Sequence, residues 1–305
     1  MYKCLKLNIY IITVKAYDSK HENEVIHQMN YNRILTIQDI SCVGQCSLTV
    51  ALPIISACGQ ECVILPSAVL STHTGGFKNM TFRDLTDDMP DILKHWQSEG
   101  ITFDAAYTGY LGSIKQIEYV KLFFEQTVKQ GGVKIVDPAM ADHGKLYSIF
   151  DMEYVKAMAG LCKEADIILP NITEAAFMSG FEYRESYDEA YIERLCEKLH
   201  EMGMKTIVLT GVSYDEATTG VLISELGGAH TYIKHRKLAK NSHGTGDIFA
   251  SAMTGAYMAG KTLAEAVEIA SSYVLSCMEA TFDDESHWYG VKFEKCLNEL
   301  VLQLT

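Results

Sequence analysis

Basic residues are scarce in this chain. The 305 residues include 26 lysines and arginines against 39 aspartates and glutamates, which gives a formal charge of -13. A nucleic-acid-binding surface needs clustered positive charge, so this balance argues against DNA or RNA as a partner. It does not exclude a nucleotide substrate, because backbone N–H groups and a magnesium ion can bind phosphate locally.

Long apolar runs, internal repeats and low-complexity linkers are also missing, so the sequence offers neither a membrane span nor a boundary between two domains. The apolar run 7–14 is closed by Lys15, and no small-residue cleavage site follows it, which argues against a signal peptide. Residues 18–27 are polar and show no periodicity. We therefore expect residues 1–28 to be an N-terminal extension outside the fold and residues 29–305 to form a single domain.

Cysteine pairs with zinc-knuckle spacing are absent as well. In the pairs Cys42/Cys46 and Cys58/Cys62, three residues separate the cysteines where zinc knuckles usually have two. Apolar neighbours such as Ala57 suit buried thiols that pack as small hydrophobic side chains. With an odd total of 9 cysteines and no secretory context, we expect free thiols and a cytoplasmic protein.

What the sequence does contain is an alternation of short apolar runs with helical patterns. Residues 48–57 and 114–128 read as helices, the second with its apolar side chains at helical spacing. Residues 220–223 and 230–233 predict an antiparallel hairpin. The remaining runs resemble strands buried on both faces, which indicates an α/β fold with a mainly parallel sheet between helices. These runs are 34–37, 62–65, 103–107, 133–136, 166–169 and 206–209.

The tetrapeptide 244–247 precedes a helical stretch of small residues. Gly244 and Gly246 allow the backbone to bend tightly and to point several N–H groups one way, and a helix that starts there adds partial positive charge. Asp247 would place a carboxylate beside this anion site, where a general base could take a proton from an attacking hydroxyl group. Capping of the helix by Asp247 is the alternative that these four residues leave open.

Polar residues or glycines follow each predicted strand of the parallel sheet. In open α/β sheets ligands bind beyond the carboxyl ends of the strands, so six polar strand ends together predict a binding site. The segments are Gln38-Asp39, Ser71 to Gly76, Thr108 to Gly112, Asp137 to Asp142, Pro170 to Glu174 and Thr210-Gly211.

The strand ends differ in their chemistry. Asp137, Asn171 and Glu174 offer the hard oxygen ligands that suit Mg²⁺, although Asn171 could instead cap the helix whose first turn holds Glu174. Tyr110 offers a flat face for an aromatic ring, or it is ordinary loop packing.

The ends of the first two strands could bind a polar ring. His73 and Thr74 could form hydrogen bonds with substituents of such a ring, or they could make local turn bonds. A local capping role is also open for Asp39.

Taken in order, these segments resemble the ribokinase-like small-molecule kinases, and among them the pyridoxal (vitamin B6) kinases. The resemblance spans residues 33–280 and implies a three-layer α/β/α sandwich, an eight- or nine-stranded, mainly parallel sheet, and a homodimer. It rests on these motifs: Ile37-Gln38, Thr72 to Gly75, Thr108 to Tyr110, Val136 to Met140, Leu169 to Ala175 and Gly244 to Asp247.

The resemblance also implies an activity: phosphorylation of the 5′-hydroxymethyl group of pyridoxal, pyridoxine or pyridoxamine by ATP with Mg²⁺, giving the 5′-phosphate and ADP. It leaves a monovalent cation open. It assigns roles to individual positions. These are Asp247 as the catalytic base; the N–H groups of Gly244, Thr245 and Gly246 as the anion hole; Asp137, Asn171 and Glu174 around the nucleotide, with Asp137 and Glu174 on Mg²⁺ directly or through water; Thr210 and Tyr147 on ATP; and Asp39, His73, Thr74 and Tyr110 around the vitamer.

The chain departs from the B6 kinase pattern at Asp39, where many members have a serine. An extra carboxylate there would favour a cationic substrate, so we expect a preference that leans towards pyridoxamine. The loop 40–47 is also about one residue short of the family's usual length, and Ala141-Asp142 replaces a Gly-Asp pair.

Three other functions compete with the B6 kinase. A hydroxymethylpyrimidine kinase would have the same fold and chemistry, but many carry a cysteine in place of Asp247 and a first loop richer in glycine. A sugar kinase would need an early Gly-Gly pair where this chain reads Ser41 to Gly44. A non-catalytic B6-binding protein would have no use for a base beside an anion hole.

Overall fold

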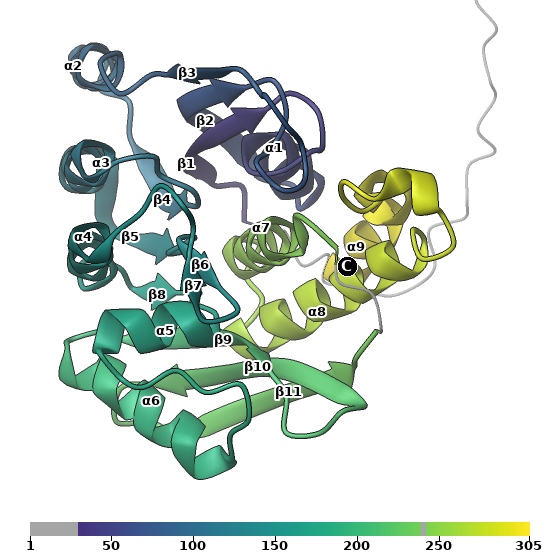
Figure 1. Ribbon diagram of the computed structural model, residues 1–305. Helices are drawn as coiled ribbons and strands as arrows, with labels where there is room; N and C mark the ends of the chain where they lie inside the picture. The colour runs from purple at the N-terminus through teal and green to yellow at the C-terminus, as the bar shows by residue number, and fades with distance from the viewer. Residues whose placement is uncertain (1–29, 239–241) are drawn as a thin grey trace, which may run out of the picture.

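A nine-stranded sheet forms the centre of the computed structural model, which describes residues 30–238 and 242–305 (Figure 1). The expected extension 1–28 lies outside the described residues. From one edge to the other the strands are β11 (His230–Arg236), β10 (Thr218–Glu225), β9 (Thr206–Val212), β8 (Ile167–Ile168), β5 (Val128–Val136), β4 (Phe103–Thr108), β1 (Arg33–Ser41), β2 (Glu61–Leu70) and β3 (Phe82–Asp84).

The six central strands, from β9 to β2, all pair in parallel, whereas β3 and the β10–β11 hairpin add antiparallel edges. The predicted parallel sheet and the predicted hairpin are therefore confirmed. The short edge strand β3 was not predicted. Its three residues are all exposed, so they carry none of the burial pattern by which a strand is recognised.

Helices cover both faces of the sheet and make the three predicted layers (Figure 1). One layer contains α2 (Met89–Ser98), α3 (Ile114–Thr127), α4 (Met152–Cys162), α5 (Ile172–Ser179) and α6 (Glu189–Glu201). The other contains α1 (Leu48–Ala57), α7 (Thr245–Met258), α8 (Leu263–Glu279) and α9 (Leu297–Leu304). The β6–β7 hairpin (Ala141–Asp142 and Lys145–Leu146) and the 3-10 turns Glu285–His287 and Phe293–Cys296 complete the elements.

Strand β1 shows why the central runs are apolar throughout. Ile34 packs into the core under α1 and α7, and its neighbour Leu35 packs into the core under α2 to α6; both are fully buried. Because successive side chains of a strand point to opposite faces, a strand covered on both sides needs apolar residues at every position.

Several boundaries differ from the predictions, and three of them bear on the site or on the helix pattern. The strands β1 and β9 run further than expected, so Gln38, Asp39, Thr210 and Gly211 lie in the last residues of their strands and not after them. Val128, predicted as the last apolar position of a helix, already belongs to β5.

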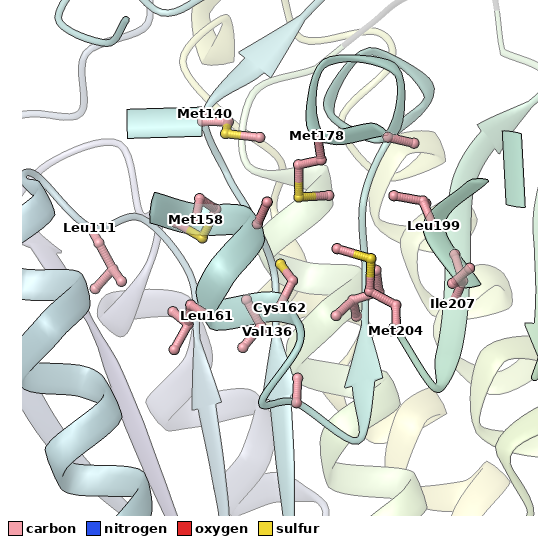
Figure 2. Packing of buried hydrophobic residues seen from close by; sticks show 14 of the residues in the cluster. Leu111, Val136, Met140, Met158, Leu161, Cys162, Met178, Leu199, Met204 and Ile207 are labelled. Atoms are coloured by element: carbon pink, nitrogen blue, oxygen red, sulfur yellow. The ribbon is translucent and has the colours of Figure 1, made fainter. Parts of the chain in front are cut away.

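The core beneath α4 and α5 is rich in sulfur. Figure 2 shows Met140, Met158, Met178 and Met204 packed there, and all four are buried. Flexible thioether side chains fill such irregular spaces well. Met140 matters for the site, because its side chain anchors the loop that follows β5 while its backbone N–H faces a buried carboxylate.

The eight cysteines of the described residues are all free. In the same part of the chain, no helix is both long and apolar enough to cross a bilayer.

Candidate active site

The carboxyl ends of the parallel strands meet at one edge of the sheet, and the loops that leave this edge carry most of the predicted site residues. Helix α7 starts at the same place, because the carboxylate of its first turn contacts the start of α1. The predicted residues therefore do converge, although they come from segments up to 200 residues apart.

The start of α7 is built around Gly244. This residue is the N-cap, with φ 78 in the left-handed region that favours glycine. A Cβ atom there would lie 3.2 Å from Cys46 Sγ and 3.4 Å from the carbonyl oxygen of Gln45. The N–H groups of Thr245 and Gly246 belong to the first turn, where no intrahelical acceptor exists, and Gly246 is exposed. This turn can therefore receive an anion.

Asp247 lies in that first turn and is partly buried. Its Oδ2 accepts a hydrogen bond from the backbone N–H of Ser47 at 3.0 Å. Burial raises the pKa of Asp247 to about 6, the Ser47 N–H opposes this shift, and the charge of Asp39 adds to it. The capping alternative does not account for the carboxylate, which is bound to the start of α1 and not to its own helix.

Glu174 is buried and its carboxylate is held by backbone amides. Oε1 accepts from Met140 N at 3.0 Å and from Ala141 N at 3.4 Å, and Oε2 accepts from Asn171 N at 2.9 Å. Burial nevertheless raises the pKa of Glu174 to about 7, since the three amides only partly replace water.

Asn171 caps α5, which was one of the two roles that the sequence left open for it. Its Oδ1 accepts from Glu174 N at 2.9 Å, which with the reverse bond forms a complete capping box, and its Nδ2 donates to Ala141 O at 2.8 Å. Thr210 pairs with Asn171 in an isolated parallel bridge, and its N–H donates to Pro170 O at 2.9 Å. Thr210 and Asn171 therefore sit side by side where β9 meets the start of α5.

Asp137 follows β5 directly, and it is affected by the charges at the starts of both α5 and α7. Burial raises the pKa of Asp137 well above its usual range, and the charges of Glu174 and Asp247 raise it further. Because two carboxyl groups oppose the ionisation of Asp137, a cation near it would be favoured. Within residues 30–238 and 242–305, no three His, Cys, Asp or Glu side chains are arranged as a metal site by themselves. The donor set thus fits an ion that brings further ligands, such as one bound to a nucleotide.

Tyr147 follows the β6–β7 hairpin and has 42% of its surface exposed. Its N–H donates to Met140 O at 2.9 Å. Burial of its hydroxyl group, together with the charges of Glu174 and Asp137, raises the pKa of Tyr147. Tyr147 therefore lies near Glu174 and Asp137, and part of its side chain is exposed to solvent.

Asp39 is turned inward, with 4% of its surface exposed, and accepts from Ser41 Oγ at 2.9 Å. Burial raises the pKa of Asp39, and the hydroxyl groups of Ser47 and Ser41 oppose the shift. Burial and then the charge of Asp39 raise the pKa of Tyr110 to about 12. Thr74 is exposed on the neighbouring loop.

His73 does not have a free ring nitrogen for a substrate. The N–H of Gly75 donates to Nδ1 at 3.0 Å, and Nε2 lies 2.7 Å from the carbonyl oxygen of Tyr289, which can only accept. A Cβ atom on Gly44 would lie 2.1 Å from the His73 ring, so the ring also packs tightly on that backbone. His73 joins three loops, and a direct bond to a substrate would have to replace one of these contacts.

Two contacts of the site were missed because their partners are remote in sequence. Ser47 holds Asp247 through its backbone, which no residue type signals, and Tyr289 meets His73 from a distance of 216 residues. The sequence also gives no sign of the positive φ of Ser47, because the residue is not a glycine.

Comparison with known proteins places the chain in a family. Residues 56–291 match the family model described as phosphomethylpyrimidine kinase. A protein from Bacteroides thetaiotaomicron VPI-5482, assigned to the phosphomethylpyrimidine kinases and crystallised with pyridoxal, is 35% identical. Its structure has a TM-score of 0.84 over 89% of this chain and 96% of that chain.

Two further relatives carry different substrate names. Pyridoxal kinase from Lactobacillus plantarum is 31% identical, with a TM-score of 0.82 over 90% of this chain and 98% of that chain. The hydroxymethylpyrimidine/phosphomethylpyrimidine kinase of Bacillus subtilis (strain 168) is 28% identical over 189 residues, which are 60% of this chain and 66% of that protein. The resemblance to the B6 kinases and the ribokinase-like fold are both confirmed, and the chain belongs to the phosphomethylpyrimidine kinase family.

Proposed function

We propose that this kinase transfers the γ-phosphoryl group of ATP to the 5′-hydroxymethyl group of a B6 vitamer. The observation that carries the proposal is the carboxylate of Asp247, fixed by the Ser47 N–H beside the open first turn of α7. The 35% identity to the Bacteroides protein crystallised with pyridoxal supports this choice of substrate.

In the proposed reaction Asp247 takes the proton of the hydroxymethyl group as that oxygen attacks the γ-phosphorus and the bond to ADP breaks. With a pKa of about 6, Asp247 is ionised at neutral pH yet basic enough to accept a proton. The N–H groups of Thr245 and Gly246, at the positive end of α7, stabilise the charge on the transferring group. Gly244 gives this turn the left-handed backbone that it needs.

Asp137 and Glu174 would hold Mg²⁺, directly or through water, with Asn171, Thr210 and Tyr147 around the nucleotide. The ion would neutralise charge on the phosphate chain and on the two carboxylates, whose pKa values are both raised. Asp39, Thr74 and Tyr110 would surround the vitamer ring. The homodimer that the resemblance implies and the cytoplasmic location expected from the free cysteines remain predictions, and dependence on a monovalent cation remains open. Light scattering, cell fractionation and added K⁺ would test them in turn.

Hydroxymethylpyrimidine is the alternative substrate, and the 28% identity to the Bacillus subtilis enzyme supports it. Both candidate substrates present a hydroxymethyl group on a nitrogen-containing aromatic ring, so the same base and anion site would serve either one.

The test is a set of initial rates with ATP, Mg²⁺ and each of pyridoxal, pyridoxine, pyridoxamine and hydroxymethylpyrimidine. We expect the highest kcat/KM with a B6 vitamer. A preference for hydroxymethylpyrimidine would replace the proposed substrate by the alternative. No ATP turnover with any of the four, together with tight binding of pyridoxal, would favour the non-catalytic binding protein.

A further inference from the structure

Ser47 has a backbone conformation that is unusual for any residue except glycine. Its φ of 57 and ψ of -124 correspond to the first central position of a type II′ turn, which glycine normally occupies. Only three other non-glycine residues among the described ones have positive φ, namely Gln45, Asn79 and His143. Such a conformation persists only where its surroundings enforce it.

The same residue also gives up a local stabilising bond. Ser47 is the N-cap of α1, and serine at this position usually accepts a hydrogen bond from its own helix through Oγ, but this cap forms no side-chain bond. Its hydroxyl group instead opposes the rise that burial causes in the pKa of Asp39. A strained backbone and a missing cap at one buried residue are a local conflict, and such conflicts mark functional positions.

The contacts of Ser47 show what the conformation achieves. Its carbonyl oxygen accepts from Val50 N at 3.1 Å and Ala51 N at 2.9 Å and so starts α1, while its N–H points away from the helix to Asp247 Oδ2 at 3.0 Å. The preceding residues Gln45 and Cys46 pack against Gly244. The amide is therefore fixed relative to the start of α7 by contacts on both sides.

We propose that Ser47 is a positioning residue, whose strained backbone aims its N–H at Oδ2 of Asp247 and so leaves Oδ1 to take the proton of the substrate hydroxyl. This inference rests on the proposed function, because the role of Asp247 as a base belongs to that proposal. It assigns the catalytic effect to the Ser47 backbone and not to its hydroxyl group.

Two substitutions separate backbone from side chain. Ser47→Gly permits the same φ without strain but lets the amide move, so kcat should fall by about 10- to 100-fold while KM for ATP stays within about twofold. Its Tm should equal or exceed that of the wild type, by up to about 4 °C. Ser47→Ala keeps the restricted backbone and the N–H, so its loss of kcat should be clearly smaller than that of Ser47→Gly. A Ser47→Gly enzyme with wild-type kcat would overturn the proposal.

A matched control is Asn79→Gly, which places glycine at another positive φ on an exposed loop and should leave kcat unchanged. The decisive comparison is the double variant Ser47→Gly/Asp247→Asn. If Ser47 acts through Asp247, the glycine adds no further loss of kcat once the base is gone. Equal fold losses in both backgrounds would show that Ser47 acts elsewhere.

A spectroscopic readout does not depend on activity. In enzyme labelled with ¹⁵N-serine, the Ser47 amide proton should shift with pH as Asp247 titrates, and this shift should vanish in Asp247→Asn. Asp39, Asp137, Cys46, Tyr107 and Tyr147 are the other titratable groups coupled to Asp247 by charge, and they are intact in both proteins. If no substrate is phosphorylated but the amide titrates, the proposed function fails while the contact stands. An amide that ignores Asp247 overturns the inference even in an active kinase.

Discussion

Two helices begin at the edge where the parallel strands end, and each has an acidic residue in its first turn, yet the two starts are built in opposite ways. At α5, Asn171 and Glu174 form a complete capping box, and Glu174 also accepts from Met140 and Ala141. At α7 the N-cap is Gly244, which has no side chain, and Asp247 is turned to Ser47 of another helix. At the start of α5 the protein itself supplies hydrogen-bond partners, whereas the start of α7 leaves backbone N–H groups that a ligand can bind.

The difference separates two uses of a helix N-terminus. A capping box stabilises the local chain and fixes the loops around it, here the segment after β5. A glycine N-cap with no side-chain bond gives up that stabilisation and keeps the anion site open. Changes at α7 should therefore affect catalysis more than stability, and changes at α5 should affect stability as well as nucleotide binding.

The largest effect is expected from Asp247→Asn. The amide keeps the shape and can still accept from the Ser47 N–H, but it cannot take a proton, so kcat should fall by about 10²–10⁴. Steady-state kinetics and ATP binding measured by calorimetry would check this. An enzyme within a few-fold of the wild type would remove Asp247 from the mechanism.

The same variant should not lose stability. The pKa of Asp247 is raised from 3.8 to about 6 in the folded protein, so the folded state binds the proton more tightly than the unfolded chain. The stabilising contribution of the protonated group is complete below about pH 4 and is lost as pH rises through about 6. Asp247→Asn should thus have its largest Tm advantage above pH 6, and thermal melts at pH 5 and pH 8 would show it.

The next effect tests the other helix start. Glu174→Ala leaves the N–H groups of Asn171, Met140 and Ala141 without their acceptor in a buried place, which should cost about 2–4 kcal/mol of unfolding free energy. Urea unfolding would measure the loss. Glu174→Ala should also raise KM for ATP.

The matched control for Glu174 is Glu265→Ala at the start of α8. Thr262 and Glu265 form the same capping box there, but on the surface, where water can replace the lost acceptor. Its loss of stability should be clearly smaller. Equal losses at the two positions would mean that the buried amides around Glu174 find other partners.

The pH dependence sharpens the comparison further. With ATP and Mg²⁺ saturating, kcat/KM for the vitamer should fall tenfold for each pH unit below about 6, because a protonated Asp247 cannot act as a base. The pKa of Glu174 is about 7, so its titration should appear instead in KM for ATP. Rate profiles from pH 5 to 8 test both statements, and an acid limb that persists in Asp247→Asn would contradict the assignment.

How much of this could be predicted from the sequence depends on the distance between partners. The capping role of Asn171 and the turn at Gly244 follow from rules that span four residues, and the apolar runs mark the parallel strands. The bonds from Ser47 to Asp247 and from His73 to Tyr289 join residues about 200 apart, and only the fold brings these together. This is why His73 looked available for a substrate when its ring nitrogens are both engaged.

Asp39 is the carboxylate whose charge raises the pKa of Asp247. Its surroundings decide how strongly it can attract a cationic substrate. It is buried, and the hydroxyl groups of Ser41 and Ser47 stabilise its charged form against the cost of burial. A cationic amine brought close to it would stabilise that form further. The aldehyde of pyridoxal, which occupies the same carbon as the amine of pyridoxamine, would not.

The smallest effect is therefore expected from Asp39→Ser, which should lower kcat/KM for pyridoxamine by an amount equal to about 1–2 kcal/mol and spare pyridoxal. The loss is modest because the serine hydroxyls already share the charge of Asp39. Parallel kinetics with both vitamers give the ratio directly. If both substrates lose the same factor, Asp39 contacts a feature that they share, such as the ring nitrogen. If neither changes, Asp39 serves the loop alone, by holding Ser41 and Ser47 in the place that the start of α7 requires.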